Sequence, residues 1–272
     1  MKCFEINLKD LYPVQGGHVQ AILGDSPHDG NTPFVRPAVI VVPGGGYGFV
    51  SKREGEPVAS GFLGRGFQTF ILTYTVAGDG VRYPEQLTEL ACTVDYVRKN
   101  ATEFHVNPDE IFLVGFSAGG HLAGNLAVDY DKVEEITGLI LDCKPTAVGL
   151  SYPVTCGHMG SFQNLLKGYE GEEYDRLFDQ VNLVKRVSPT TVPAFIWTTA
   201  QDGLVPPCDS LYFATELSKN KIPFELHVYP HGHHGLSTGS REINGDIPAL
   251  ALVSRWLEDC ARFFRYYCQE KA

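Results

Sequence analysis

The sequence predicts an α/β protein built on a doubly wound, mostly parallel β-sheet. Short apolar, β-branched runs alternate along the chain with stretches whose apolar residues recur at helical spacing. This alternation is typical of a parallel sheet that is covered by helices on both faces. The 272 residues lie within the range of one large α/β domain, so we expect a single domain over residues 1–272.

The first part of the chain supplies three strands and two helices. Residues 39–42 form a continuous apolar run, typical of a strand buried on both faces. Residues 54–63 are expected to be helical, and residues 67–76 are β-rich and partly alternating. The segment 84–100 has apolar residues spaced by three and four and begins with a proline, which suits a first helical turn. Residues 111–114 are again short, apolar and β-branched.

The rest of the chain continues the alternation around one insertion. We expect further strands at 147–150, 194–199 and 225–229, and helices after residue 117 and at 133–141, 208–220 and 247–267. The segment 155–188 contains glycines, polar residues and only modest helical periodicity, with no strong strand signal. We interpret this segment as an insertion that forms a small helical cap over the pocket.

The charge and residue composition restrict the binding partners and the cellular compartment that we expect. The formal net charge is -10, with 43% hydrophobic and 20% charged residues, which argues against nucleic acid and anionic membranes as main partners. No apolar run is long enough to span a bilayer, and the N-terminus lacks the apolar core of a signal peptide. The seven cysteines form no C-x-x-C or metal-site spacing. We therefore expect a cytoplasmic protein with reduced thiols.

The segment Gly115-Phe116-Ser117-Ala118-Gly119 fits the pattern G-x-S-x-G. It lies between a predicted strand and a predicted helix, as in a nucleophile elbow, where a strained turn exposes the serine hydroxyl. We expect that positions 115 and 119 require glycine, because a Cβ there would collide with a neighbouring strand or helix. Glycine-rich strand-to-helix turns also match this pattern by chance. The hypothesis of nucleophilic acyl transfer therefore needs a base, a carboxylate and oxyanion donors.

The base is sought among the histidines that follow the last predicted strand. His231, His233 and His234 lie in a glycine-flanked loop, and we choose His234 because Gly235 follows it. Three clustered histidines could instead ligate a metal, but adjacent histidines suit one ion poorly and no acidic motif accompanies them. We therefore predict no metal and no cofactor. His121, just after Ser117, is interpreted as a helix or pocket-wall residue.

Asp202 is the predicted carboxylate partner of His234. It follows the strand predicted at 194–199 and completes the chain order Ser117, Asp202, His234. The competing interpretation is that Asp202 merely caps a turn with Gly203. All three catalytic candidates follow predicted strands, and ligands of doubly wound sheets bind at the carboxyl ends of the strands. We therefore expect these side chains to meet at one edge of the sheet.

The segment Pro43-Gly44-Gly45-Gly46-Tyr47 follows the strand at 39–42 and is the predicted oxyanion loop. Glycines allow the backbone to approach a substrate oxygen closely. We predict that the N–H groups of Gly44, Gly45 and Ala118 hold the oxyanion. A phosphate-binding loop is disfavoured because no lysine follows the glycines and no G-x-G-x-x-G occurs.

These motifs together resemble the α/β-hydrolase superfamily, with greatest similarity to small bacterial acetyl esterases that include acetyl-xylan and other carbohydrate esterases. The segments that carry the resemblance are 43–47, 51–57, 115–122, 151–154, 202–206 and 232–235. The resemblance implies the α/β-hydrolase fold and a cofactor-free serine carboxylesterase for short-chain acyl esters, including those of acetylated sugars. One departure is Pro43, where related lipases and esterases carry histidine. Arg53 and Glu54 either pair, hold the oxyanion loop, or form a solvated helix start.

Tyr47, Tyr152 and His158 are the predicted walls of a pocket for a small-molecule ester. A peptidase or amidase with the same triad is an alternative enzyme class. A non-catalytic, ligand-binding relative is an alternative of another kind, although such relatives usually lack a triad member and none is missing here. The sequence leaves open the acyl length, the alcohol and whether the chain forms a homo-oligomer.

Overall fold

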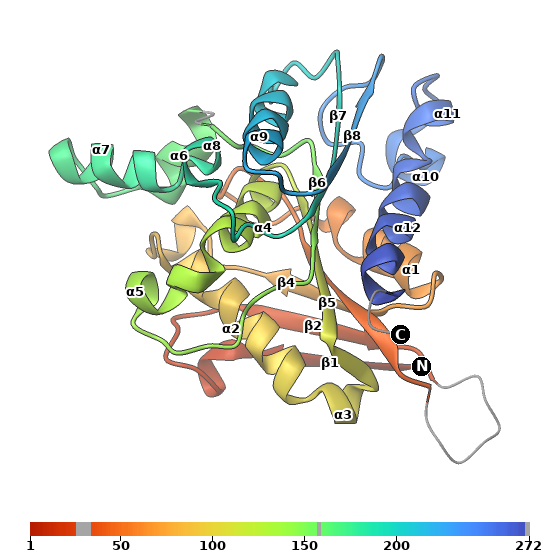
Figure 1. The fold of residues 1–272 in the computed structure, drawn as a ribbon, viewed down its shortest axis with the longest axis horizontal. Coiled ribbons are helices and arrows are strands. Elements are labelled where there is room, and N and C mark those ends of the chain that lie inside the picture. Colours follow the sequence, from red (N-terminus) through yellow and green to blue (C-terminus); the bar gives the residue numbers. More distant parts are fainter. Residues whose placement is uncertain (26–33, 157–158, 270–272) are drawn as a thin grey trace.

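The computed structural model describes residues 1–25, 34–156 and 159–269, and its centre is one β-sheet (Figure 1). The strands of these residues follow the order β1-β2-β4-β3-β5-β6-β7-β8. They are β1 (Lys2–Asn7), β2 (His18–Leu23), β3 (Arg36–Val42), β4 (Gln68–Thr73), β5 (Val106–Phe116), β6 (Val148–Ser151), β7 (Ala194–Thr199) and β8 (Phe224–Tyr229). β1 pairs with β2, and β2 with β4, in antiparallel fashion, whereas all other neighbours are parallel. The predicted mostly parallel sheet is thus confirmed.

Helices cover both faces of the sheet (Figure 1). α1 (Glu56–Leu63) and α12 (Trp256–Gln269) lie on one face, and α2 (Glu85–Lys99), α4 (Ala118–Asp129) and α9 (Cys208–Lys219) lie on the other. The shorter helices are α3 (Ala101–Phe104), α5 (Val133–Thr137), α6 (Met159–Leu165), α7 (Gly171–Gln180), α8 (Leu183–Arg186), α10 (Arg241–Asn244) and α11 (Leu250–Val253). Among the described residues, no helix is both long and apolar enough to cross a membrane.

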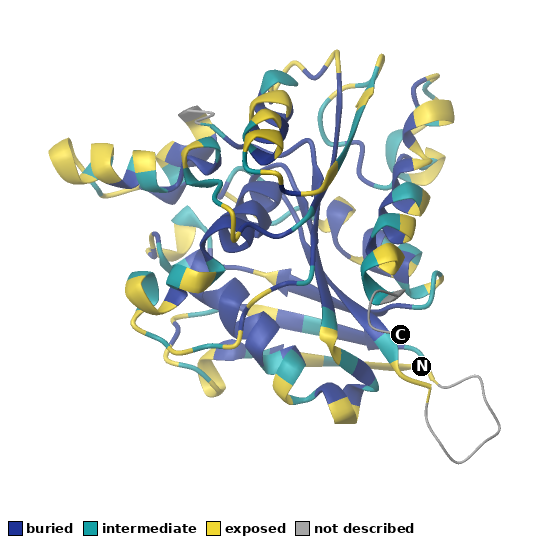
Figure 2. Cartoon of the chain, viewed as in Figure 1, coloured by how far each residue is buried: buried dark blue, intermediate teal, exposed yellow. Residues whose placement is uncertain are grey.

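Alternation along the central strands divides the core into two layers. In β3, Ile40 and Val42 pack with the α2, α4 and α9 side, whereas Val39 and Val41 pack with α1 and α12. Successive side chains of a strand point to opposite faces, so a strand between two helical layers must be apolar throughout. Figure 2 shows the resulting continuous burial of the central strands. Burial on both faces explains why the continuous apolar run at 39–42 predicts a strand.

Most predicted elements appear with shifted ends, and the strands β1 and β2 were not predicted. Their residues include Lys2, Glu5 and His18, and β1 is a largely exposed edge strand, so their apolar signal is weak. The helix predicted at 133–141 is too long, because α5 ends at Thr137 and Gly138 adopts a left-handed φ of 76°.

The long helix predicted at 247–267 is interrupted. α11 ends at Val253 and α12 begins at Trp256. The loop after β8 packs against this break, since a Cβ on Gly239 would lie 2.9 Å from the Ser254 Cα. The Trp256 indole N–H also donates to the Ser237 carbonyl over 2.8 Å. Such tertiary contacts leave no trace in the helical periodicity of the sequence.

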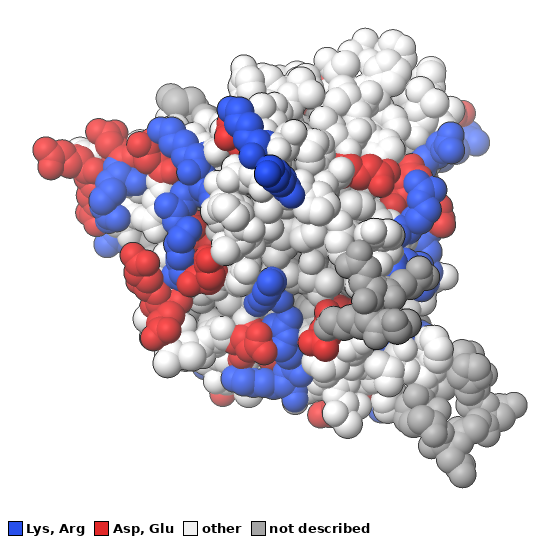
Figure 3. All heavy atoms as spheres, viewed as in Figure 1, with Lys and Arg blue, Asp and Glu red and all other residues white. Residues whose placement is uncertain are grey.

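The segment predicted as an insertion lies between β6 and β7 and contains α6, α7 and α8, with no strand among its described residues. In Figure 1 it extends from the sheet beside α4. Arg186 of α8 binds the buried Asp129 carboxylate at the end of α4 over 2.6 Å, which fastens the segment to the core. On the face in Figure 3, basic and acidic side chains intermingle over this region.

We predict that Gly119→Ala destabilises the protein by about 3 kcal/mol or more, because overpacking against backbone cannot relax. A Cβ on Gly119 would lie 2.2 Å from the carbonyl oxygens of both Val42 and Pro43. Chemical denaturation of the variant measures the loss. Gly78→Ala is the matched control, since a Cβ there meets nothing within 4 Å. Equal unfolding free energies for the two variants would contradict the prediction.

Candidate active site

Ser117 occupies a sharp turn between β5 and α4. Its backbone has φ 53° and ψ -119°, a strained conformation for a residue with a side chain. The turn is held because the Ser117 N–H donates to the Ser151 carbonyl over 3.0 Å, while the Ser117 carbonyl accepts the His121 N–H. A Cβ on Gly115 would lie 2.3 Å from the Gly119 carbonyl oxygen. The predicted strained turn and the need for small residues around it are both confirmed.

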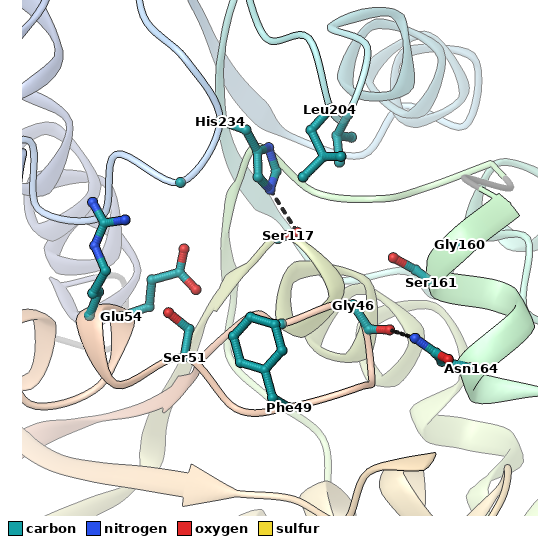
Figure 4. A pocket seen from close by; sticks show the side chains of 14 residues that line it. Gly46, Phe49, Ser51, Glu54, Ser117, Gly160, Ser161, Asn164, Leu204 and His234 are labelled. Atoms are coloured by element: carbon teal, nitrogen blue, oxygen red, sulfur yellow. Dashed lines mark hydrogen bonds between the residues drawn. The ribbon is translucent and has the colours of Figure 1, made fainter. Parts of the chain in front are cut away.

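The structure brings Ser117, His234 and Asp202 into one hydrogen-bonded row. His234 Nε2 lies 2.9 Å from Ser117 Oγ, as Figure 4 shows, and His234 Nδ1 lies 2.7 Å from Asp202 Oδ2. A carboxylate can only accept, so Nδ1 carries the proton and Nε2 is left to accept from the serine hydroxyl. This arrangement can remove the serine proton and hold it on the imidazole.

Asp202 also caps the turn that follows β7. Its second oxygen, Oδ1, accepts the N–H groups of Leu204 and Val205, each over 2.9 Å. The two interpretations of Asp202 therefore do not compete, because one oxygen caps the turn and the other meets His234. The backbone bonds also fix the carboxylate, which is only 7% exposed.

The loop after β3 lies against Ser117, but its three glycines do not act alike. The Gly44 N–H donates to the buried carboxylate of Glu54 over 2.8 Å. The prediction that Gly44 binds the oxyanion is therefore wrong, because its donor is already used. Within the described chain no group accepts the Gly45 N–H, and Ala118 begins α4, where the N–H has no acceptor inside the helix. The N–H groups of Gly45 and Ala118 therefore remain the predicted oxyanion donors.

Solved structures similar over almost the whole chain identify its family. An α/β-hydrolase enzyme from a Medee basin deep-sea metagenome library is 30% identical with a TM-score of 0.78, covering 98% of this chain and 98% of that chain. The chain belongs to the α/β-hydrolase superfamily. An acetyl ester-xyloside bifunctional hydrolase from Caldicellulosiruptor lactoaceticus is also 30% identical, with a TM-score of 0.81, covering 97% of this chain and 96% of that chain. The family model described as BD-FAE matches residues 26–148.

Two curated relatives are longer than this α/β-hydrolase chain. The endo-1,4-beta-xylanase B of Butyrivibrio fibrisolvens is 36% identical over 220 residues, which is 78% of this chain and 34% of the relative. The acetylxylan esterase of Xylanibacter ruminicola is 30% identical over 213 residues, which is 75% of this chain and 42% of the relative. The chain thus spans well under half the length of each.

The predicted pocket walls require correction in this α/β-hydrolase. Tyr47 is fully buried, and its hydroxyl meets His121 Nδ1 at 2.7 Å rather than facing the cavity. Tyr152 is 2% exposed and lies behind His234, with its ring edge-on to the imidazole at 4.8 Å between centroids. Both side chains belong to the core clusters, and both residues have positive φ angles, of 58° and 38°. His158 lies outside the described residues.

The cavity beside Ser117 has a volume of about 410 Å³ (Figure 4). Sequence reasoning missed several of its walls, which come from the oxyanion loop, α6 and the turn after Asp202. They are Gly46, Phe49, Ser51, Gly160, Ser161, Asn164, Leu204 and Val205. Phe49 and Ser51 lie shortly after the glycine loop at 43–47, and this proximity is the one local sequence signal for them. Among the described residues, no three or more His, Cys, Asp or Glu side chains are arranged to hold a metal ion.

His121 links the glycine loop after β3 to the segment between β6 and β7. Its Nδ1 accepts from the Tyr47 hydroxyl, and its Nε2 meets the Val181 carbonyl at 2.7 Å, so Nε2 carries the proton. Burial lowers the pKa of His121 to about 4 and keeps the ring neutral. The sequence had placed His121 on the helix or pocket wall; the structure places it on α4 beneath the loop, fully buried.

We predict that His121 makes the protein less stable as the pH falls from about 6.5 through 4. Histidine in the unfolded chain titrates near about 6.5, so in this window the unfolded state binds more protons than the folded state. The full effect is roughly 3 kcal/mol, with a slope of up to about 1.4 kcal/mol per pH unit. Denaturation of wild type and His121→Gln between pH 7 and 4.5 measures it, with the exposed His18→Gln as control. Equal slopes for wild type and His121→Gln would contradict the prediction.

Proposed function

We propose that this α/β-hydrolase is a serine carboxylesterase that hydrolyses short-chain acyl esters, chiefly acetyl esters, through an acyl-enzyme. The observation that carries the proposal is the row Asp202–His234–Ser117, which ends at a cavity with Ser117 and His234 in its wall. Serine needs an adjacent base to act as a nucleophile, and this row supplies one together with the carboxylate that orients it.

The reaction uses groups of this chain alone. Ser117 Oγ attacks the ester carbonyl carbon while His234 Nε2 takes its proton, and Asp202 stabilises the resulting imidazolium. The N–H groups of Gly45 and Ala118 meet the negative oxygen of the tetrahedral intermediate. His234 then gives its proton to the leaving alcohol. Water, deprotonated by the same imidazole, attacks the acyl-enzyme and releases the acid.

Acetylated sugars are the proposed substrate class. The cavity is small, about 410 Å³, and combines the apolar Phe49 with polar groups from Ser51, Ser161 and Asn164. Such a lining suits a short acyl group on an alcohol that carries further hydroxyls. The acetylxylan esterase and the acetyl ester-xyloside hydrolase among the relatives support this class.

We also place the protein in a reducing compartment, the cytoplasm, because all seven cysteines are free.

We predict that Ser117→Ala removes nearly all hydrolysis of p-nitrophenyl acetate, a loss on the order of 10⁴–10⁶ in kcat. The fold should survive, because a hydroxyl is lost without new bulk, and circular dichroism and thermal melting check this. A fluorophosphonate should label the wild-type protein at Ser117 and leave the variant unlabelled. An unlabelled wild type with no esterase activity would favour a non-catalytic ligand-binding protein.

We predict that acetyl esters are the preferred substrates within a p-nitrophenyl ester series from two to eight acyl carbons. Each methylene that the cavity cannot seat should lower kcat/KM by about tenfold or more. Release of acetate from acetylated xylo-oligosaccharides, measured beside the series, tests the sugar assignment. Cleavage of peptide p-nitroanilides without acetate-ester activity would instead identify a peptidase or amidase.

A further inference from the structure

Glu54 is a buried carboxylate in the wall of the cavity, held by two donors. It is 4% exposed. Its Oε2 accepts the Gly44 N–H over 2.8 Å, and its Oε1 accepts the Tyr152 hydroxyl over 2.7 Å. Arg53, its neighbour, bonds instead to the Asn244 side chain and the Ile243 carbonyl. Of the interpretations left open by sequence, Glu54 holds the loop, and the solvated helix start is wrong for this residue.

Tyr152 extends this contact to the segment that carries His234. Its hydroxyl accepts the Ser237 N–H over 2.9 Å, which leaves the hydroxyl proton for Glu54. Its ring lies edge-on to the His234 imidazole at 4.8 Å and to the Trp197 indole at 4.9 Å between centroids. One carboxylate and one phenol therefore join the chain segments that follow β3, β6 and β8.

The pKa of the Glu54 carboxyl is raised above its ordinary value, because the effect of burial outweighs the hydrogen bonds that favour the ionised form. Burial raises the pKa of this carboxyl, whereas the hydrogen bonds from Tyr152 and Gly44 and the nearby His234 and Arg53 oppose that rise. Burial and the nearby Glu54 raise the pKa of Tyr74, whose hydroxyl donates to the Pro43 carbonyl. A buried carboxylate is costly to place, and an apolar residue would pack here at less cost. The buried carboxyl group therefore calls for a role other than stability.

The geometry of Gly44 shows where such a role would act. A Cβ on Gly44 would lie 2.9 Å from Ser117 Cβ and 2.9 Å from Glu54 Oε2, so loop, nucleophile and carboxylate are in close contact. Fixing the peptide that ends in the Gly44 N–H also restrains the next peptide, which carries the Gly45 N–H. An oxyanion donor works only when it is held in place before the charge develops.

We propose that Glu54 and Tyr152 form a positioning pair that holds the Gly45 donor and the His234 ring in register with Ser117. The proposal rests on the esterase function proposed above. Neither residue of the pair makes or breaks a bond in the reaction. Its effect should fall on the transition state, because the oxyanion and the imidazolium exist there and not in the bound ester.

The test compares Glu54→Gln, Tyr152→Phe and the double variant with wild type on p-nitrophenyl acetate. Each single change should lower kcat by about 10²-fold, the effect of a misplaced catalytic group, with KM within about twofold. The double variant should lose much less than the product of the single losses, because both changes break one contact. Affinity for a trifluoromethyl ketone, which forms a tetrahedral oxyanion on serine, should fall in proportion to kcat/KM.

Glu89→Gln is the matched control for loss of a buried carboxyl group, since burial also raises the pKa of Glu89, to about 8. Glu89 is fully buried and its Oε2 accepts the Thr75 N–H over 2.8 Å, but it does not line the cavity. We expect this variant to lose thermal stability and keep the wild-type kcat. If Glu54→Gln behaves in the same way, Glu54 is only structural and the proposal is overturned.

Two further results separate the proposal from the function on which it rests. A wild type that hydrolyses esters and is labelled at Ser117, with Glu54→Gln and Tyr152→Phe at full kcat, overturns the positioning pair alone. A wild type without activity or label overturns the esterase function itself. If Glu54→Gln fails to fold, Tyr152→Phe decides, since it removes one hydroxyl and leaves the ring against His234.

Discussion

The close approach of the turn at Ser117 to the chain after β3 is the constraint on which the site depends. β3 and β5 are parallel neighbours, with Val42 opposite Gly115, so both strands end at the same edge of the sheet. There the backbone at Gly119 presses on the carbonyls of Val42 and Pro43, leaving no room for a Cβ. This contact places the first N–H of α4 beside the glycine loop. Backbone packing thus brings Ser117 close to its predicted oxyanion donors.

Two buried carboxyl groups, of Asp202 and Glu54, make the same kind of contacts in the site. Each binds backbone N–H with one oxygen and a side chain with the other. Asp202 uses one oxygen for the N–H groups of Leu204 and Val205 and the other for His234. Glu54 uses one oxygen for the Gly44 N–H and the other for the Tyr152 hydroxyl. Backbone N–H groups stabilise a buried anion and also fix its direction. Each carboxylate can therefore orient an aromatic ring, and the two rings, of His234 and Tyr152, lie against each other.

The sequence predicted those parts of the site that follow from topology. Ser117, Asp202 and His234 each follow a strand, and parallel strands bring their carboxyl ends together whatever the details of packing. The same reasoning failed for Gly44 and Tyr47, because their roles depend on where one N–H and one ring point. Their directions are set by Glu54 and His121, which lie elsewhere in the chain. The edge strand β1 was missed for a related reason, since its exposed polar residues carry little periodicity.

The segment between β6 and β7 supports the glycine loop after β3 and also lines the cavity. Asn164 of α6 donates to the Gly46 carbonyl over 2.8 Å. The Val181 carbonyl, just after α7, accepts from His121, whose other nitrogen holds the Tyr47 hydroxyl. The segment between β6 and β7 thus contacts the glycine loop directly through Asn164 and indirectly through His121 of α4. A displacement of α6 or of the chain at Val181 would therefore reach the glycine loop through these hydrogen bonds.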